Sequence, residues 1–209
     1  MILGLTGGIA CGKSVAGATL AAHGVPVLDA DEVSHYLTKY EPAVIDSIVK
    51  AFGREILTPH GQIDRLKLGE RVFASPPERA KLESILHPPI KQILLKAIRH
   101  GRKHEYNISF VAPLLIEANF QDIVDVIWVI SSDERLQAER LRKDYGFSEM
   151  DAFRRINAQL PLREKEAYAD YVLNNDGSLE QFKQLVMATW ERTLKDFNSG
   201  RTPSRQKKA

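Results

Sequence analysis

Residues Gly7 to Ser14 read GGIACGKS and fit the pattern GxxxxGK(S/T) of a phosphate-binding loop. The glycines allow a tight turn, and backbone N–H groups at a helix N-terminus direct partial positive charge at phosphate oxygens. Lys13 would neutralise the β- and γ-phosphates, and Ser14 would be a ligand of magnesium. The segment therefore predicts a site for ATP or GTP with Mg²⁺.

Such a loop works between a strand and a helix, and the neighbouring residues predict both. Ile2–Thr6 is a short apolar run typical of a buried strand, and Lys13–Ala22 reads as a helix that stops at Gly24. Pro26–Ala30 predicts a second strand. We expect a βαβ unit whose two strands lie parallel.

Three later runs complete the expected sheet. Tyr106–Ala112 and Asp125–Ile130 are apolar and β-branched, as is usual for strands covered on both faces, and Tyr171–Leu173 is a shorter candidate. The predicted fold class is α/β, a three-layer P-loop NTPase fold with a five-stranded parallel sheet.

Two helical regions interrupt this predicted core. The region 32–105 is too long for one crossover and shows helical periodicity, which predicts an inserted helical domain. Its expected helices are Ala43–Phe52, Leu66–Phe73 and Arg79–Leu86, the last preceded by the helix-start signal Ser75-Pro76.

The second region, 134–166, reads as a pair of helices, Glu134–Lys143 and Glu149–Leu160, where a lid could lie. Its many Lys and Arg residues are matched by acids, so most should be solvated. A long helix, Ser178–Phe197, follows the last strand. The expected layout is a nucleotide-binding core (1–31, 106–133, 167–197), a substrate insert (32–105), a lid (134–166) and a flexible basic tail (198–209).

Two acids stand where the second predicted strand ends. Alternation along an extended strand would point Asp29 and Asp31 the same way, toward the crevice beside the phosphate-binding loop. A general base for an attacking hydroxyl could lie there. The alternative is that one of these aspartates caps the following helix.

Composition excludes several classes of protein. The net charge is +2, but four positive charges and no acid lie in residues 198–209, so the rest of the chain has no basic excess to bind nucleic acid. No apolar run is long enough to span a membrane, and no signal peptide is recognised, so we expect a cytoplasmic protein. The single Cys11 leaves no disulfide. At a helix N-terminus its thiol pKa should be lowered, and its oxidation could then block nucleotide binding.

Several motifs occur together in one order along the chain: GGIACGKS, DAD at 29–31, ILHPPI at 85–90, APLLIE at 112–117, QAERL at 137–141, RINAQ at 155–159 and DYVLNNDGS at 170–178. Together they resemble the dephospho-CoA kinase family, and the resemblance runs to about Leu194. It implies transfer of the ATP γ-phosphate, with Mg²⁺, to the ribose 3′-hydroxyl of dephospho-CoA.

The resemblance also implies roles for residues. Asp31 would be the general base, Lys13 and Arg140 would act on the phosphates, and Asn175 would contact the adenine, although NNDG is equally a good turn sequence. The expected ATP contacts are Gly8, Ile9, Ala10, Cys11, Gly12, Lys13, Ser14, Val15, Arg140 and Asn175. The expected substrate contacts are Asp29, Asp31, His35, His87, Pro113, Leu114 and Leu115.

The chain departs from the family pattern at a few positions. Ala10 and Cys11 replace the usual Gly and Ser, while His35 and Lys143 replace arginines. Lysine cannot make the bidentate fork of arginine, so Lys143 offers phosphate only a charge. The alternative activity is that of another small P-loop kinase acting on a nucleoside monophosphate or a small alcohol. A monomer or weak homo-oligomer is expected.

Overall fold

Five short strands form one sheet in the order β2-β3-β1-β4-β5. The pairings of β1 with β3, β1 with β4 and β4 with β5 are all parallel. Every residue of β1 and β4 is buried, which explains why their sequences are apolar without alternation. The predicted α/β class with five strands is confirmed. The strands are Ile2–Gly7 (β1), Val27–Asp29 (β2), Ile108–Val111 (β3), Val126–Ser131 (β4) and Tyr171–Asn174 (β5).

The computed structural model describes residues 1–201, apart from the side chain of Phe73. It divides into two units: the first is Met1–Leu28 with the chain from Ile98 onward, and the second is Asp29–Ala97. Most of the basic tail predicted at 198–209 lies outside the described residues. Within them, no helix is both long enough and apolar enough to cross a membrane.

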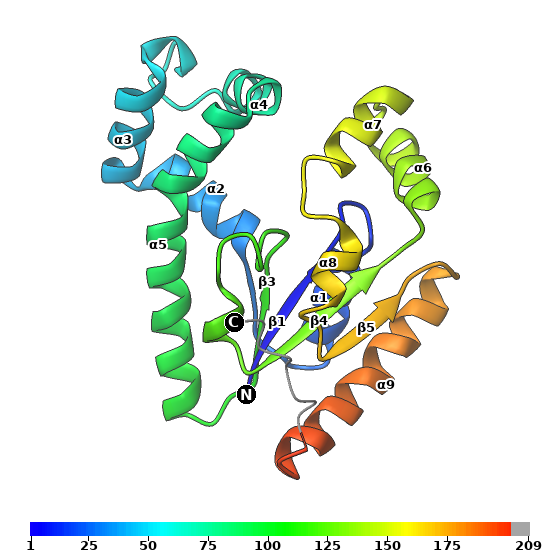
Figure 1. Ribbon diagram of the computed structural model, residues 1–209. Helices are drawn as coiled ribbons and strands as arrows, with labels where there is room; N and C mark the ends of the chain where they lie inside the picture. Colours follow the sequence, from blue (N-terminus) through cyan, green and yellow to red (C-terminus); the bar gives the residue numbers. More distant parts are fainter. Residues whose placement is uncertain (202–209) are drawn as a thin grey trace. The chain divides into compact units, whose positions relative to one another are not determined.

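Two helices cover one face of the sheet in the first unit. α1 (Lys13–Ala22) and α9 (Leu179–Asn198) pack together beside the strands (Figure 1). Their apolar side chains belong to the same core as those of β1 and β4. In that core the indole of Trp128 on β4 donates to Thr193 Oγ1 at 3.0 Å and meets Trp190 edge-on. A capping box begins α9, since the side chains of Ser178 and Gln181 accept from each other's backbone N–H groups.

The second unit is helical, as predicted. It contains α2 (Ala30–Tyr40), α3 (Pro42–Phe52), the 3₁₀ turn η1 (Arg54–Ile56), α4 (Arg65–Ala74) and most of α5 (Pro76–Lys103). Its packing is local: Arg71 donates to the carbonyl oxygen of Phe52 at 2.7 Å, and its guanidinium lies over that phenyl ring.

Helix α5 is longer than expected, because we predicted that it would end at Leu86 before the proline pair. It instead continues through Pro88 and Pro89. Each proline removes an intrahelical hydrogen bond. Buried side chains at a spacing of four, Leu86, Ile90 and Leu94, continue across the interruption, so packing on one face maintains the helix.

The predicted pair of helices between β4 and β5 is present, with different ends. α6 spans Glu134–Tyr145, and α7 spans Glu149–Ile156, four residues shorter than predicted. The hydroxyl of Ser148 caps α7 by accepting from the backbone N–H of Asp151 at 3.1 Å. Pro161 then precedes the five-residue helix α8 (Leu162–Glu166), which the sequence analysis missed. A short turn, η2 (Gln121–Ile123), leads into β4.

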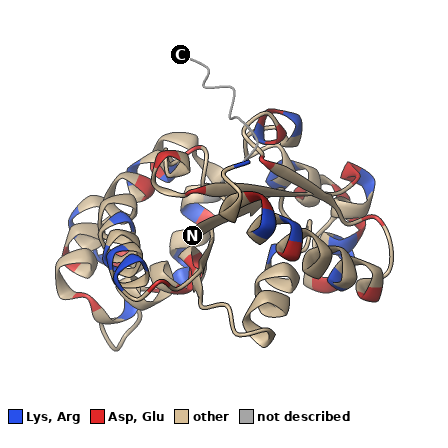
Figure 2. Cartoon of the chain, turned by 90° about the horizontal axis from the view of Figure 1, so that it is seen from below, with Lys and Arg blue, Asp and Glu red and all other residues tan. Residues whose placement is uncertain are grey.

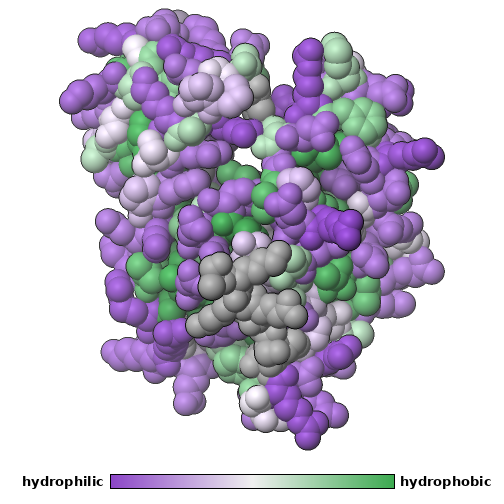
Figure 3. All heavy atoms as spheres, viewed as in Figure 1, coloured by the Kyte–Doolittle hydropathy of each residue, from purple (hydrophilic) through white to green (hydrophobic). Residues whose placement is uncertain are grey.

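Figure 2 shows residues of both charges distributed over several helices of the described chain. On the face drawn in Figure 3, hydrophilic residues predominate and hydrophobic residues appear among them in small groups.

Candidate active site

The loop between β1 and α1 has a backbone that only glycine fits at two positions. Gly7 has φ +147°, and a side chain there would collide with the carbonyl oxygen of Ile130 on β4. Gly12 has φ +100°, and a side chain there would collide with the amide of Asn175. The loop is therefore packed closely at both ends, against β4 at Gly7 and against Asn175 at Gly12.

Lys13 and Ser14 begin α1, where the motif predicts them. The Lys13 ammonium donates to the carbonyl oxygens of Gly8 at 2.7 Å and Gly7 at 3.2 Å. The Lys13 side chain therefore lies over the phosphate-binding loop, and its ammonium is beside the backbone of Gly7 and Gly8. Ser14 is exposed, so its hydroxyl is accessible to an ion.

Arg140 on α6 braces the outside of the same loop. One of its terminal nitrogens, Nη1, donates to the Ala10 carbonyl at 3.1 Å and to Ser132 Oγ at 3.0 Å, and Nη2 donates to the Asn175 carbonyl at 2.7 Å. Its guanidinium thus joins the phosphate-binding loop to the ends of β4 and β5.

Asn175 makes the return connection. Its side-chain amide donates to the Cys11 carbonyl at 2.9 Å, and the side chain is 8% exposed. In this structure the predicted adenine contact therefore acts as a second brace of the loop. Leaving a buried peptide carbonyl without a hydrogen-bond donor costs free energy, so loss of the Asn175 amide should destabilise the loop.

The tip of the loop also has apolar contacts with the α6–α7 pair. Ile9 and Ala10 pack against a small buried cluster of Ala138, Leu141 and Ala152. Ala10 has φ +57°, a left-handed backbone that is unusual for a residue with a side chain. Helices in the predicted lid region therefore determine the shape of the loop.

The hypothesis of a reactive Cys11 is wrong. The thiol is fully buried, and this burial raises its pKa to about 11, while the nearby charges of Lys13, Arg140 and Lys165 oppose the rise only in part. Loss of solvation outweighs the electropositive surroundings. The sequence motif indicated those surroundings correctly but carried no information on burial.

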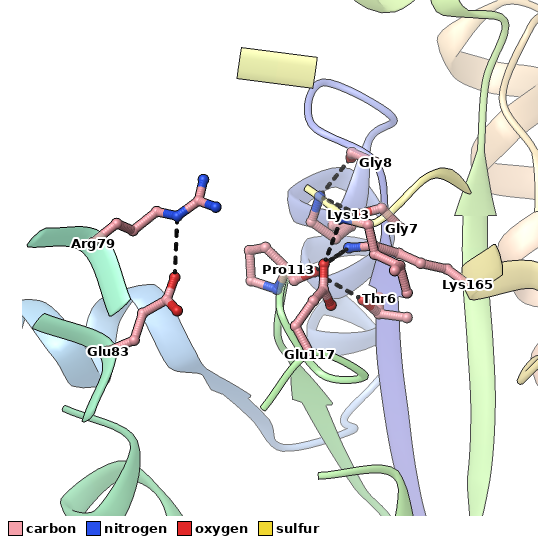
Figure 4. A network of polar contacts seen from close by, with 10 residues as sticks. Thr6, Gly7, Gly8, Lys13, Arg79, Glu83, Pro113, Glu117 and Lys165 are labelled. Carbon is pink, nitrogen blue, oxygen red and sulfur yellow. Dashed lines mark hydrogen bonds and ion pairs between the residues drawn. The ribbon is translucent and has the colours of Figure 1, made fainter. Parts of the chain in front are cut away.

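Charged ends of three side chains gather beside the loop after β3, as Figure 4 shows: Lys13, Glu117 and Lys165. Lys165 on α8 is 0% exposed, its Nζ lies 2.9 Å from Glu117 Oε1, and it donates to the Pro113 carbonyl at 2.6 Å. Thr6 at the end of β1 donates to that carbonyl at 3.2 Å.

Comparison with known proteins agrees with this geometry. The model of a family described as dephospho-CoA kinase matches residues 1–181. The chain belongs to the dephospho-CoA kinase family. Among curated members, that of Geobacter metallireducens is 38% identical over 195 residues, 93% of this chain and 97% of that protein. That of Geobacillus kaustophilus is 40% identical over 192 residues, 90% and 94% of the two chains.

Solved structures place the fold among P-loop kinases. The protein TT1252 of Thermus thermophilus is 28% identical, with a TM-score of 0.76 over 92% of this chain and 97% of that one. The dephospho-CoA kinase of Campylobacter jejuni has a TM-score of 0.68 at 24% identity, covering 95% and 98%. A shikimate kinase of Acinetobacter baumannii, at 14% identity and a TM-score of 0.55 over 93% of each chain, shares the fold alone.

The two aspartates after β2 do not alternate along one strand as we predicted. Asp29 ends β2, but Asp31 lies in the first turn of α2. Asp29 Oδ1 accepts from the backbone N–H of Asp31 at 2.7 Å and of Glu32 at 3.4 Å, so Asp29 is the cap of the helix. Asp31 is exposed on that first turn.

The remaining predicted substrate residues differ in exposure. His35 is exposed on α2, one turn beyond Asp31. His87 on α5 is half-buried, and this burial lowers the pKa of its imidazole. The nearby charge of Glu83 acts in the opposite direction and has a smaller effect. Pro113 and Leu114 are partly exposed, whereas Leu115 is fully buried, with its side chain close to Gly4 of β1. The side chain of Leu115 therefore packs the loop after β3 against the middle of β1.

Sequence reasoning missed Glu117 and Lys165. Lys165 was counted among cations expected to lie on solvated helix faces, yet it is buried. Glu117 closes the APLLIE motif, and the position of an acid at the end of an apolar run was the available signal. A partner for it 48 positions later could not be read from helix or strand periodicity.

Proposed function

We propose that the protein transfers the γ-phosphate of ATP to the 3′-hydroxyl of dephospho-CoA, giving coenzyme A and ADP. The observation that carries this is the braced phosphate-binding loop of GGIACGKS in a chain whose family match covers residues 1–181. The alternative, another small P-loop kinase for a nucleoside monophosphate or small alcohol, is supported only by likeness of fold.

The residues fit ATP because the loop is already closely packed, with no room for side chains at Gly7 and Gly12. When ATP is bound, the backbone N–H groups of residues 8–14 donate to its phosphates, and Lys13 exchanges its two carbonyl partners for phosphate oxygens. Arg140 and Asn175 hold the loop, and Arg140 also contributes positive charge beside it.

Magnesium also fits the donors present. No group of three potential acidic, histidine or cysteine ligands occurs within residues 1–201. Mg²⁺ needs none, because it retains waters and binds phosphates with only one or two protein oxygens. The exposed hydroxyl of Ser14 would be the protein ligand. The ion would neutralise charge on the phosphates during transfer.

For the acceptor, we propose Asp31 as the general base. Its place in the first turn of α2, with Asp29 capping the same turn, fixes its backbone while leaving the carboxylate exposed. The acceptor would also be bound by His35, His87, Pro113, Leu114 and Leu115, of which Leu115 could contribute only its backbone or its support of the loop.

The layout proposed from the sequence assigns functions to segments. The helical region 32–105 would bind dephospho-CoA, and the region 134–166 would act as a lid over the nucleotide. Ile9 packs against the helices of this region, and Arg140 of α6 donates to the Ala10 carbonyl; both contacts support a link between lid and loop. A monomer or weak homo-oligomer in the cytoplasm, binding no nucleic acid, completes the proposal.

One experiment tests this function. Purified protein is given Mg·ATP with dephospho-CoA, AMP, GMP or shikimate in parallel, and ADP release is measured. Dephospho-CoA is expected to be the acceptor that drives release, with coenzyme A as the product by mass spectrometry. Release driven by AMP, GMP or shikimate and not by dephospho-CoA would refute it.

A further inference from the structure

Lys165 and Glu117 form an ion pair in the first unit, in which the lysine is buried and the glutamate side chain is 23% exposed. The Lys165 side chain has no exposed surface, and its ammonium is satisfied by Glu117 Oε1 at 2.9 Å and by the Pro113 carbonyl at 2.6 Å. Removing an ammonium and a carboxylate from water is costly unless both find close partners. A hydrophobic pair of the same size would cost less, so these charges need an explanation beyond packing.

The pair joins two segments that are distant in sequence. Glu117 and Pro113 belong to the loop that follows β3, whereas Lys165 lies on α8, which packs on β1 and β4. Glu117 Oε1 also accepts from the backbone N–H of Leu160, just before α8, at 3.1 Å. The loop after β3 is therefore fastened, across the end of β1, to the segment that leaves the α6–α7 pair (Figure 4).

The fastened loop lies on one particular side of the phosphate-binding loop. Arg140 and Asn175, which brace residues 10 and 11, come from α6 and from the end of β5, on the β4 side of β1. The loop 112–117 follows β3, on the opposite side of β1. Ligands of parallel sheets bind at these carboxyl ends. The residues that hold the phosphate-binding loop come from the β4 side of β1. The β3 side of β1 is therefore the side where we expect the second substrate.

One atom of the pair is left incomplete. Glu117 Oε2 is buried and has no hydrogen-bond partner within the described part of the chain, although Oε1 has two. A buried oxygen in this state is destabilising until a donor reaches it.

We infer that Glu117 and Lys165 are positioning residues for the phosphate acceptor: their ion pair fixes the loop 112–117 on the side of β1 away from the nucleotide braces. The inference rests on the proposed function. It differs from a purely structural role, because losing the pair should weaken the acceptor more than ATP.

The test measures both substrates separately in Lys165→Met and Glu117→Gln. Calorimetry with dephospho-CoA should show a dissociation constant raised about 10-fold or more, and its KM should rise in parallel. The dissociation constant of Mg·ATP should change less than about threefold, because the bonds of Arg140 and Asn175 to the phosphate-binding loop are untouched. Arg163→Met, an exposed cation two residues away on α8, is the matched control and should leave both constants unchanged.

A double variant separates positioning from stability. Lys165→Met alone leaves a buried carboxylate and should lower Tm by about 10 °C. Glu117→Gln with Lys165→Met removes both charges and should recover most of that loss. The weak acceptor binding should persist, because the Pro113 carbonyl keeps Thr6 but loses its bond to Lys165 on α8. Glu117→Gln alone keeps the shape of the side chain, so it reports on the pair even if Lys165→Met does not fold.

Three results would overturn the inference: acceptor binding unchanged in folded single variants, ATP weakened by the same factor as the acceptor, or acceptor affinity restored together with Tm in the double variant. The unmodified protein distinguishes these from failure of the proposed function. If it phosphorylates dephospho-CoA but the variants bind that acceptor normally, only the inference fails.

Discussion

The guanidinium of Arg140 donates a hydrogen bond to the backbone carbonyl of Asn175 at 2.7 Å, while the side chain of Asn175 donates to the carbonyl of Cys11 at 2.9 Å. Arg140 and Asn175, which were expected to contact the nucleotide, thus hold the backbone of the phosphate-binding loop in place. Their substitution should change affinity through the shape of the loop as well as through direct contact, which makes the first two predictions specific.

Arg140→Lys should weaken Mg·ATP binding about 10-fold and lower kcat about 10²-fold. Lysine keeps the charge but lacks the planar fork whose two terminal nitrogens reach the carbonyls of Ala10 and Asn175. Isothermal titration and steady-state kinetics measure the two effects. The control is Arg142→Lys, an exposed arginine of the same helix. Equal losses in both variants would show that the fork of Arg140 has no special role.

Asn175→Ala should lower stability by about 1–3 kcal/mol, because it leaves the Cys11 carbonyl buried without a donor. Urea unfolding measures this loss, and ATP affinity should fall with it. Asn174→Ala, at the exposed neighbouring position, should change neither quantity much. If Asn175→Ala weakened ATP binding at unchanged stability, the adenine contact would be its main role.

The two aspartates after β2 should behave differently. Asp31→Asn should reduce kcat by about 10² to 10⁴-fold, the usual effect of losing a positioned base. Asp29→Asn should leave stability almost unchanged, since asparagine caps a helix as well as aspartate, and Asp29→Ala should cost about 1 kcal/mol. Rate assays beside thermal unfolding test this. Full activity in Asp31→Asn would remove the assignment of the base.

Lys13→Ala should abolish nearly all turnover while the protein stays folded. The lysine supplies the charge nearest to the bridging oxygens of the triphosphate, and alanine is well tolerated in a helix. Circular dichroism checks the fold. Lys183→Ala, on the C-terminal helix α9, serves as a control for loss of a positive charge.

Cys11 should be unreactive. Its pKa is raised from 9.0 to about 11, so at neutral pH the thiolate is roughly a hundredfold scarcer than in the unfolded chain. Alkylation by iodoacetamide should be slow in the native protein and fast in urea, and peroxide should not inhibit turnover. Because the folded-state pKa is the higher one, the thiol's contribution to stability is complete below about pH 9 and is lost as the pH rises toward 11.

Local features of the sequence predicted much of this architecture. The bounds of α1, the strand before it and the capping box of α9 follow from short-range patterns, because nearest neighbours determine them. Asp31 shows where such reasoning ends: the letters of DAD fit a strand, but the cap formed by Asp29 turns the chain into a helix one residue later. Pro88 and Pro89 signalled a helix end, which long-range packing overrode.

The sequence predicted the phosphate-binding loop itself, but it did not predict the side chains that hold this loop in place. GGIACGKS identifies the loop because the spacing is local. The contacts that brace it connect residues 130 and 164 positions apart, Arg140 with Ala10 and Asn175 with Cys11. No periodicity reports such contacts, so side chains assigned to the ligand were found holding the loop, and burial reversed the expected pKa shift of Cys11.

The alanine at position 10 affects how rigid the phosphate-binding loop is before ATP binds. A methyl group held at φ +57° is strained by about 1 kcal/mol or more, yet it narrows the conformations open to the unfolded chain compared with glycine. The phosphate-binding loop thus loses conformational entropy when the chain folds, and little more is lost when ATP binds. A preshaped receptor of this kind gains its ligand quickly and with little rearrangement, so association rates should approach those of a rigid surface.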